Sequence, residues 1–479
     1  MKARERLLAL LVASAVLAGC AHYPVNAPLA HYTPDAGYRF PTMVADRPDP
    51  ADELFVCVSL SGGGTRAAAL AYGALLKLRD TNIGREGAAK SLLDEVDCVA
   101  GISGGAFTAA YYGLFGRAIF DNFYREFLVR DIQGELALRA GNPANLARLA
   151  SPYFSRIDLA AELYDETVFH GKTFAALSER PRPFVTLHAT SMADGGRFEF
   201  TQDQFDFLGS DLQPFPVARA VAASSAFPFL LSPVSLRSFP PPADFVVPRD
   251  VTNALASRDD NLARYNWARQ RMDTVSTGEK WVHLLDGGLS DNIGLRSILT
   301  AMDRTSGFIR QRINAGRIKR LVVIAVNART DPPEQLSQQE RSPGLVDVAL
   351  KTATVSMEGL SFDTLDFAAA RQNEREQAQT NIRVCNQRLG QCGAQPFPAF
   401  AQEVRACFVE LDFEALPSPD REWFLGLPTT FALPESTVKR LIDVAGTLLD
   451  GSRDFQKLLR ALRGEPALGA GVGEAGNCS

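Results

Sequence analysis

The chain has 479 residues, of which 46% are hydrophobic and 22% charged. This composition favours a substantial packed core and argues against global disorder, and the length fits one large domain or two to three average ones. A formal net charge of −5 argues against a general nucleic-acid binder, which is usually basic. With 5 histidines and no Cys-x-x-Cys pair, the chain also offers little for a zinc site.

The first twenty residues have the pattern of an export signal. Basic residues in MKARER precede LLALLVASAVLA, an apolar run shorter than the ~20 residues that a membrane-spanning helix needs. LAGC, at 17–20, resembles the lipobox of bacterial lipoproteins, so we expect a signal peptide over 1–19 and a lipid on Cys20. An ordinary signal peptide with an unrelated cysteine is the alternative. By resemblance to Gram-negative sorting rules, Ala21 favours the outer membrane of the cell envelope over the inner one.

The next segments predict a tether and then an α/β domain. Residues 20–50 are rich in proline and lack apolar periodicity, which is typical of an extended tether. LFVCVSL, at 54–60, reads as a strand buried on both faces, and SGGGTRAAALAYGALLKL as a glycine turn that opens a helix. VDCVAGISGGAFTAAYYGLFG repeats this strand–turn–helix order. Two such units in sequence predict a parallel sheet with helices on its faces.

The remaining chain continues the pattern, and we place the domain over 51–330. The expected elements are helices in 117–180, strands at 183–192 and 197–202, a small-residue helix at 217–231, and strands in KWVHLLDGG and at 318–328. The intervening 232–279 reads as a lid, a docking surface or a plain insertion. Residues 331–479 are expected to form a mostly helical extension packed on this domain.

Six cysteines remain if Cys20 carries a lipid, and an even number in an exported chain permits disulfides. Cys57 and Cys98 lie in apolar runs, where a cysteine is often a small core residue. One or two bridges are expected among the other four, whose pairing the sequence does not reveal: Cys385, Cys392, Cys407 and Cys478.

Ser103 is the first candidate for chemistry. GISGG, at 101–105, fits G-x-S-x-G between a predicted strand and a predicted helix, where a strained turn exposes the hydroxyl. A serine in an ordinary turn is the alternative. A serine nucleophile needs a base, and in α/β-hydrolases a histidine follows the acid late in the chain. Here no histidine follows His283, and His170 and His188 are assigned structural roles.

A carboxylate and a glycine turn complete the candidate site. Asp286 in LLDGGLSDNIG ends an apolar run and offers a base, although Asp-Gly is also a common turn pair. His283 lies three residues earlier, which places it on the opposite face of a strand. SGGGTRA, at 61–67, directs backbone N–H groups toward one cavity, which suits an oxyanion, whereas a tight structural turn is the alternative. It lacks the G-K-[ST] of a nucleotide P-loop.

The ordered motifs SGGGTRA, GISGG and LDGGLSDN resemble those of the patatin-like phospholipase family, over roughly residues 54–330. AVAASSAFPFLLSPV also looks like an Ala/Ser-rich segment of that family. The resemblance implies a three-layer α/β/α fold with a mainly parallel sheet and a Ser-Asp dyad without histidine. Ser61 and Ala67 depart from the residues common in the family. Carried over to this chain, the site is Ser103 as nucleophile, Asp286 as base, Gly62, Gly63 and Gly64 as oxyanion donors, and Arg66 as a brace for the loop or a phosphate contact.

We therefore expect a serine acyl hydrolase that cleaves carboxylic esters of phospholipids or lysophospholipids through an acyl-enzyme. The resemblance implies no metal or organic cofactor, a membrane lipid as substrate and no nucleic acid. The alternatives are a neutral-lipid lipase, a thioesterase or an acyltransferase with the same dyad, or a non-catalytic envelope lipoprotein.

Overall fold

The computed structural model describes residues 21–43, 53–84, 89–180, 182–258, 262–303, 308–331, 340, 342–396, 404–465 and 478. The predicted signal peptide, Cys20 and residues 44–50 of the predicted tether lie outside the described residues. None of the described helices is both long enough and apolar enough to cross a membrane.

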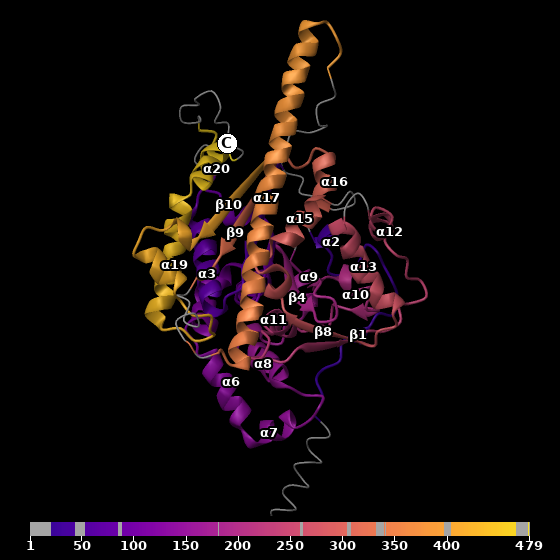
Figure 1. Ribbon diagram of the computed structural model, residues 1–479, viewed down its shortest axis with the longest axis vertical. Coiled ribbons are helices and arrows are strands. Elements are labelled where there is room, and N and C mark those ends of the chain that lie inside the picture. Colours follow the sequence, from indigo (N-terminus) through magenta and orange to yellow (C-terminus); the bar gives the residue numbers. More distant parts are fainter. Residues whose placement is uncertain are drawn as a thin grey trace, which may run out of the picture.

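A central sheet runs in the order β10-β9-β2-β3-β4-β8-β7, and β5 pairs with β4 (Figure 1). The five strands from β10 to β4 are parallel, whereas β8, β7 and β5 pair antiparallel with their neighbours. This is the mainly parallel sheet that the sequence predicts. The strands are β1 (Ala27–Pro28), β2 (Leu54–Leu60), β3 (Val96–Gly101), β4 (Phe184–Ser191), β5 (Arg197–Glu199), β6 (Ser210–Asp211), β7 (Val234–Arg237), β8 (Trp281–Asp286), β9 (Arg320–Asn327) and β10 (Arg405–Asp412).

Helices lie on both sides of the sheet (Figure 1). The helix after β2 packs against the helix after β3, and the penultimate helix of the chain packs against the former. The helices are α2 (Phe40–Met43), α3 (Gly64–Asp80), α4 (Gly104–Phe115), α5 (Ile119–Phe123), α6 (Ile132–Gly141), α7 (Pro143–Leu149), α8 (Arg156–Tyr164), α9 (Phe174–Ser178), α10 (Gln202–Phe205), α11 (Val217–Ser224), α12 (Arg249–Leu255), α13 (Leu262–Ser276), α14 (Gly288–Asp291), α15 (Leu295–Asp303), α16 (Phe308–Asn314), α17 (Leu345–Gln391), α18 (Asp420–Leu425), α19 (Glu435–Gly451) and α20 (Arg453–Arg463).

Two disulfides join described cysteines, and one of them corrects the sequence analysis. Cys57 and Cys98 form a bond between β2 and β3, because the register of these parallel strands sets the two residues opposite each other. They are therefore not the unbonded core residues that the apolar runs suggested. Cys407 of β10 bonds Cys478. Cys385 and Cys392 are exposed free cysteines. They lie seven positions apart at the C-terminal end of α17, where the helical rise over this interval is about 10 Å, too far for a bond between them.

The segment before β2 packs along the domain, so the predicted tether is wrong for residues 21–43. Its aromatic and amide side chains find buried partners there. Tyr38 is fully buried, and its hydroxyl both donates to the carbonyl of Val185 and accepts from that residue's N–H. Asn26 donates to the carbonyl of Arg237, beside the pairing of β1 with β6.

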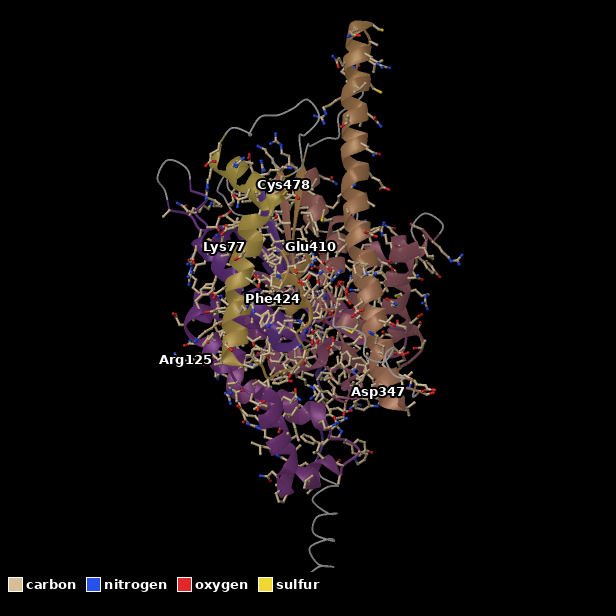
Figure 2. All side chains as sticks on the ribbon, turned by 60° about the vertical axis from the view of Figure 1, so that its left-hand side comes forward. Lys77, Arg125, Asp347, Glu410, Phe424 and Cys478 are labelled. Carbon is tan, nitrogen blue, oxygen red and sulfur yellow. A yellow bond between two sulfur atoms is a disulfide. The ribbon has the colours of Figure 1, made fainter. Side chains whose placement is uncertain are left out.

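The residues after 330 complete the central sheet as well as adding helices. β10 pairs with β9 along its whole length and forms the edge of the sheet. α17 belongs to the expected helical extension, but it projects well beyond the body, with Asp347 at its lower end (Figure 2). Within the expected insertion 232–279, β7 joins the sheet, and α12 and α13 enclose a small second core with Phe207.

Candidate active site

Ser103 occupies a strained turn between β3 and α4. Its backbone lies at φ 48° and ψ −116°, a conformation that non-glycine residues rarely adopt. Gly105, two residues on, makes this turn possible, because a Cβ there would lie 2.5 Å from the carbonyl oxygen of Leu60. The Ser103 N–H donates to Oγ of Ser224 at 2.9 Å. The turn therefore holds a serine at the end of a parallel strand, as in a nucleophile elbow.

Asp286 lies level with this serine although its strand runs in the opposite direction. Gly101 pairs with Leu187 of β4, and Ala189 of β4 pairs with Asp286. Ser103 follows Gly101 by two residues, just as Ala189 follows Leu187. The antiparallel register thus brings the last residue of β8 to the height of the serine.

The Asp286 carboxyl group is buried beside the side chain of Ser103. Its Oδ1 accepts from the N–H of Gly288 at 2.8 Å, and the Ser103 side chain lies close enough to lower the pKa of the carboxyl group. Burial is the larger effect and raises this pKa to about 7, against the opposing effect of these two groups. A carboxyl group with this pKa exchanges a proton readily near neutral pH, as a general base must.

The three glycines of the turn before α3 are not equivalent. The Gly62 N–H donates to the carbonyl of Asn292 at 2.9 Å, so the structure contradicts its expected role as an oxyanion donor. Gly63 at φ 137° and Gly64 at φ 61° adopt conformations that favour glycine. Neither of these two N–H groups donates to another described residue. Gly64 also packs against the backbone of Thr430, which no larger residue would permit.

Arg66 lies buried beneath the glycine turn. Its guanidinium donates to the carbonyls of Ala328 and Leu427, each at 2.9 Å, and to Oγ1 of Thr429 at 3.1 Å. Burial lowers its pKa to about 10, which leaves it charged at neutral pH. In the structure Arg66 thus connects the turn to the segment before α19, and its three donors point at protein groups.

No base for Ser103 comes from His170, His188 or His283 in the described structure. His188 is fully buried with neither ring nitrogen bonded to a described residue, and burial lowers its pKa to about 3. His170 lies 3.4 Å from a carboxylate oxygen of Glu126. His283 is exposed and hydrogen-bonded to Ser235, on the face of β8 opposite Asp286. No cluster of three or more metal-ligating side chains occurs in the described part of the chain.

Sequence reasoning missed several residues that shape this site. Ser224 links the GISGG and LDGGLSDN motifs. Its Oγ accepts a hydrogen bond from the N–H of Ser103, and its carbonyl accepts one from the N–H of Gly287. It lies in the Ala/Ser-rich segment, which was a usable signal. Asn292 lies in LDGGLSDN, and its Oδ1 has no partner among the described residues. Thr430 contributes a backbone carbonyl, and no motif marks such a contribution.

Fold and geometry first define the class of the protein. A mainly parallel sheet flanked by helices, with a strained serine between a strand and a helix, is the arrangement of an α/β hydrolase nucleophile turn. Residues 58–299 match the family described as patatin-like phospholipase. The chain belongs to the patatin-like phospholipase family, as the sequence motifs predicted.

Comparison with solved structures finds remote likenesses. Human GIVD cytosolic phospholipase A2 is 16% identical, with a TM-score of 0.42, over 95% of this chain and 66% of that one. Its complex with methyl gamma-linolenyl fluorophosphonate and terbium chloride has a TM-score of 0.36 over 88% of this chain and 61% of that one, also at 16% identity. VipD from Legionella pneumophila is 12% identical, with a TM-score of 0.25, over 82% of this chain and 67% of that one. Comparison with curated proteins finds no match.

Proposed function

We propose that the protein is a serine acyl hydrolase that cleaves carboxylic ester bonds of phospholipids or lysophospholipids with a Ser103–Asp286 dyad. The observation that carries this proposal is the strand register that brings the buried carboxyl group of Asp286 level with Ser103, whose side chain lies beside it. Membership of the family supports a lipid acyl hydrolase.

In the first half of the reaction, Ser103 Oγ attacks the ester carbonyl while its proton passes to Asp286. The negative charge that develops on the carbonyl oxygen is stabilised by the N–H groups of Gly63 and Gly64, at the start of α3, where the helix dipole also favours an anion. The tetrahedral intermediate then collapses. Its ester bond breaks, Asp286 returns the proton to the departing alkoxide, and the acyl group stays on Ser103.

In the second half, a water molecule enters and Asp286 removes one of its protons. The resulting nucleophile attacks the acyl-enzyme carbonyl, the same two N–H groups hold the oxyanion, and the bond to Ser103 breaks. Ser103 recovers its proton from Asp286 and a fatty acid leaves. One residue thus acts as base and then as acid in each half-reaction, which suits a pKa near 7.

Labelling with a fluorophosphonate probe tests the nucleophile. We expect the purified protein to react at Ser103 and the Ser103→Ala protein to remain unlabelled. Ser225→Ala is the matched control, because Ser225 is buried nearby but its hydroxyl donates to the carbonyl of Val221 at 2.9 Å. A folded protein that stays unlabelled, with or without lipid vesicles, would support the non-catalytic alternative. Turnover of phospholipid, triacylglycerol and acyl-thioester substrates then separates the remaining classes.

We also propose that a lipid on Cys20 anchors the protein in the bacterial envelope, at the outer membrane. The support is the LAGC sequence with Ala21 after the cysteine. Expression in a Gram-negative host with labelled palmitate tests this: the label should enter the protein, be lost in the Cys20→Ala variant and fractionate with the outer membrane. A processed but unlabelled protein would indicate an ordinary signal peptide.

A further inference from the structure

Five large apolar side chains are exposed near α6, α7 and the turn after α11. We call this group the apolar end of the molecule. α6 packs against both α7 and α8, and the first residue of α8, Arg156, donates to the carbonyl of Phe229, so the segments that carry these side chains adjoin one another. Figure 1 shows α6 and α7 at the lower end of the described part of the chain. The apolar end consists of Leu138 (79% exposed), Leu146 (54%), Tyr153 (54%), Phe229 (56%) and Leu230 (61%).

The apolar end borders the candidate active site on two sides. On one side, Gln133 of α6 accepts a hydrogen bond from Thr430, the residue that packs against Gly64. On the other side, Ala226 lies three residues before Phe229, and its carbonyl accepts a hydrogen bond from the N–H of Asp286. A lipid that approached from the apolar end would therefore meet the edge of the site.

The start of the described chain lies at the same place. The carbonyl of Ala21 accepts from Oγ of Ser151 at 2.7 Å, and the N–H of Tyr23 donates to the carbonyl of Tyr153 at 2.9 Å. The ring of His22 stacks on that of Tyr153. Ala21, which follows Cys20 in the sequence, is therefore fixed on the apolar end. Any anchor carried by Cys20 would hold this face toward its membrane.

The charge at this surface fits phospholipid headgroups. Arg139 pairs with Glu166 and Arg148 pairs with Glu162. Arg156 is exposed and has no carboxylate partner among the described residues, while its guanidinium lies against the carbonyl of Phe229. A cation beside exposed apolar groups is suited to a phosphate at the boundary between headgroups and acyl chains.

We propose that the apolar end is the surface through which the protein docks onto a phospholipid bilayer, with its leucines and Phe229 inserted and Arg156 at the phosphates. The inference rests on the proposed function, and it deepens that function by stating how a bilayer lipid reaches Ser103. Exposed apolar groups gathered at one end of a protein commonly mark an interaction site.

Tryptophan quenching tests the orientation without requiring activity. The full chain carrying Ser103→Ala, with Leu146→Trp, Leu230→Trp or Val384→Trp added singly, is mixed with phosphatidylethanolamine/phosphatidylglycerol vesicles that contain brominated acyl chains. Val384 is the matched control, because it is 44% exposed and lies near the C-terminal end of α17, away from the apolar end in sequence. We expect quenching of the added tryptophan at positions 146 and 230 only. No quenching at these two positions, or equal quenching at 384, would overturn the proposal.

Catalysis gives a second and separable readout. The Leu146→Glu/Leu230→Glu protein should hydrolyse vesicle phospholipid about tenfold or more slowly, because each inserted leucine loses its burial in the bilayer. Its hydrolysis of a water-soluble short-chain ester should be unchanged, as should both activities of Val384→Glu. If the tryptophan variants are quenched but the natural protein hydrolyses neither substrate, the docking surface stands and the proposed function fails. If both substrates are hydrolysed at natural rates by the double variant, the function stands and docking fails.

Discussion

In the proposed mechanism, Asp286 must ionise in a buried place that disfavours its charge. Burial raises its pKa to about 7, and only the ionised form accepts the serine proton. We therefore expect kcat/KM for a soluble ester to rise with pH and to level off above about 7. A pH–rate profile from pH 5 to 9 measures this. A flat profile would show that the carboxyl group titrates well below pH 5 or does not limit the reaction.

The same burial predicts a gain in stability when the charge is removed. The folded-state pKa is about 7 and the ordinary value is 3.8, so the folded state holds the proton more tightly between these pH values. The contribution of this group to stability is therefore full below pH 3.8 and is lost as pH rises through about 7. Asp286→Asn should raise the free energy of unfolding by about 2–4 kcal/mol at pH 8 and by little at pH 4. Urea unfolding at both pH values measures this, and an equal effect at both would contradict it.

Asn292 and Gly62 form a second tightly packed pair at the site. A Cβ on Gly62 would lie 2.5 Å from Oδ1 of Asn292 and 3.4 Å from Cβ of Ser103. We expect Gly62→Ala to lower kcat/KM by about tenfold or more, because the turn that carries the proposed oxyanion donors, Gly63 and Gly64, must shift. Adding Asn292→Gly removes the obstructing side chain and should restore part of the loss. A double variant no better than Gly62→Ala would place the damage in the glycine turn itself.

At the scale of elements, the sheet depends on strands from both ends of the chain. β10 covers the edge of β9, and Arg66 donates to Leu427, so the residues after 330 support both the sheet and the glycine turn. A chain that ends at residue 330 should therefore be insoluble, because β9 would present a long apolar edge. Solubility and circular dichroism of this truncation, beside the full chain, measure the effect. A soluble, fluorophosphonate-reactive fragment would show that the catalytic region folds alone.

Local sequence patterns predicted the strands and turns whose residues are typical of buried strands and of glycine turns. β2 and β3 are buried on both faces and read as continuous apolar runs, and the turns at Gly63 and Ser103 carry glycines that their conformations require. The antiparallel direction of β8 was not predictable, because strand direction depends on distant pairing. The docking of residues 21–43 escaped prediction for a similar reason, since its partners, such as Val185, are far along the chain.

In the candidate site, the side chains could be predicted from the sequence, whereas the roles of backbone atoms could not. Ser103 and Asp286 were predicted because motifs mark side chains that do chemistry, and the structure brings the two together. The family match confirms the motif-based assignment of the family. The engaged N–H of Gly62 and the role of Thr430 arise from backbone atoms, which every residue possesses. No residue type therefore signals them.

At the scale of the whole molecule, the cysteines predict a simple chemical pattern. Alkylation of the native protein should modify Cys385 and Cys392, which are exposed and free. Four more cysteines should react only after reduction and unfolding: Cys57, Cys98, Cys407 and Cys478. Peptide mass spectrometry measures both steps. Modification of Cys57 in the native, unreduced protein would contradict the bond between β2 and β3.

The Cys57–Cys98 disulfide bears on the conditions under which the candidate active site is complete. β2 leads into the glycine turn and β3 leads into Ser103, so the Cys57–Cys98 link ties the two halves of the site together covalently. While its thiols are reduced, these strands are held side by side only by their ladder of hydrogen bonds and by packing. Such bonds form and persist in oxidising compartments. We therefore expect the site to hold this cross-link in an oxidising environment and to lack it in a reducing one.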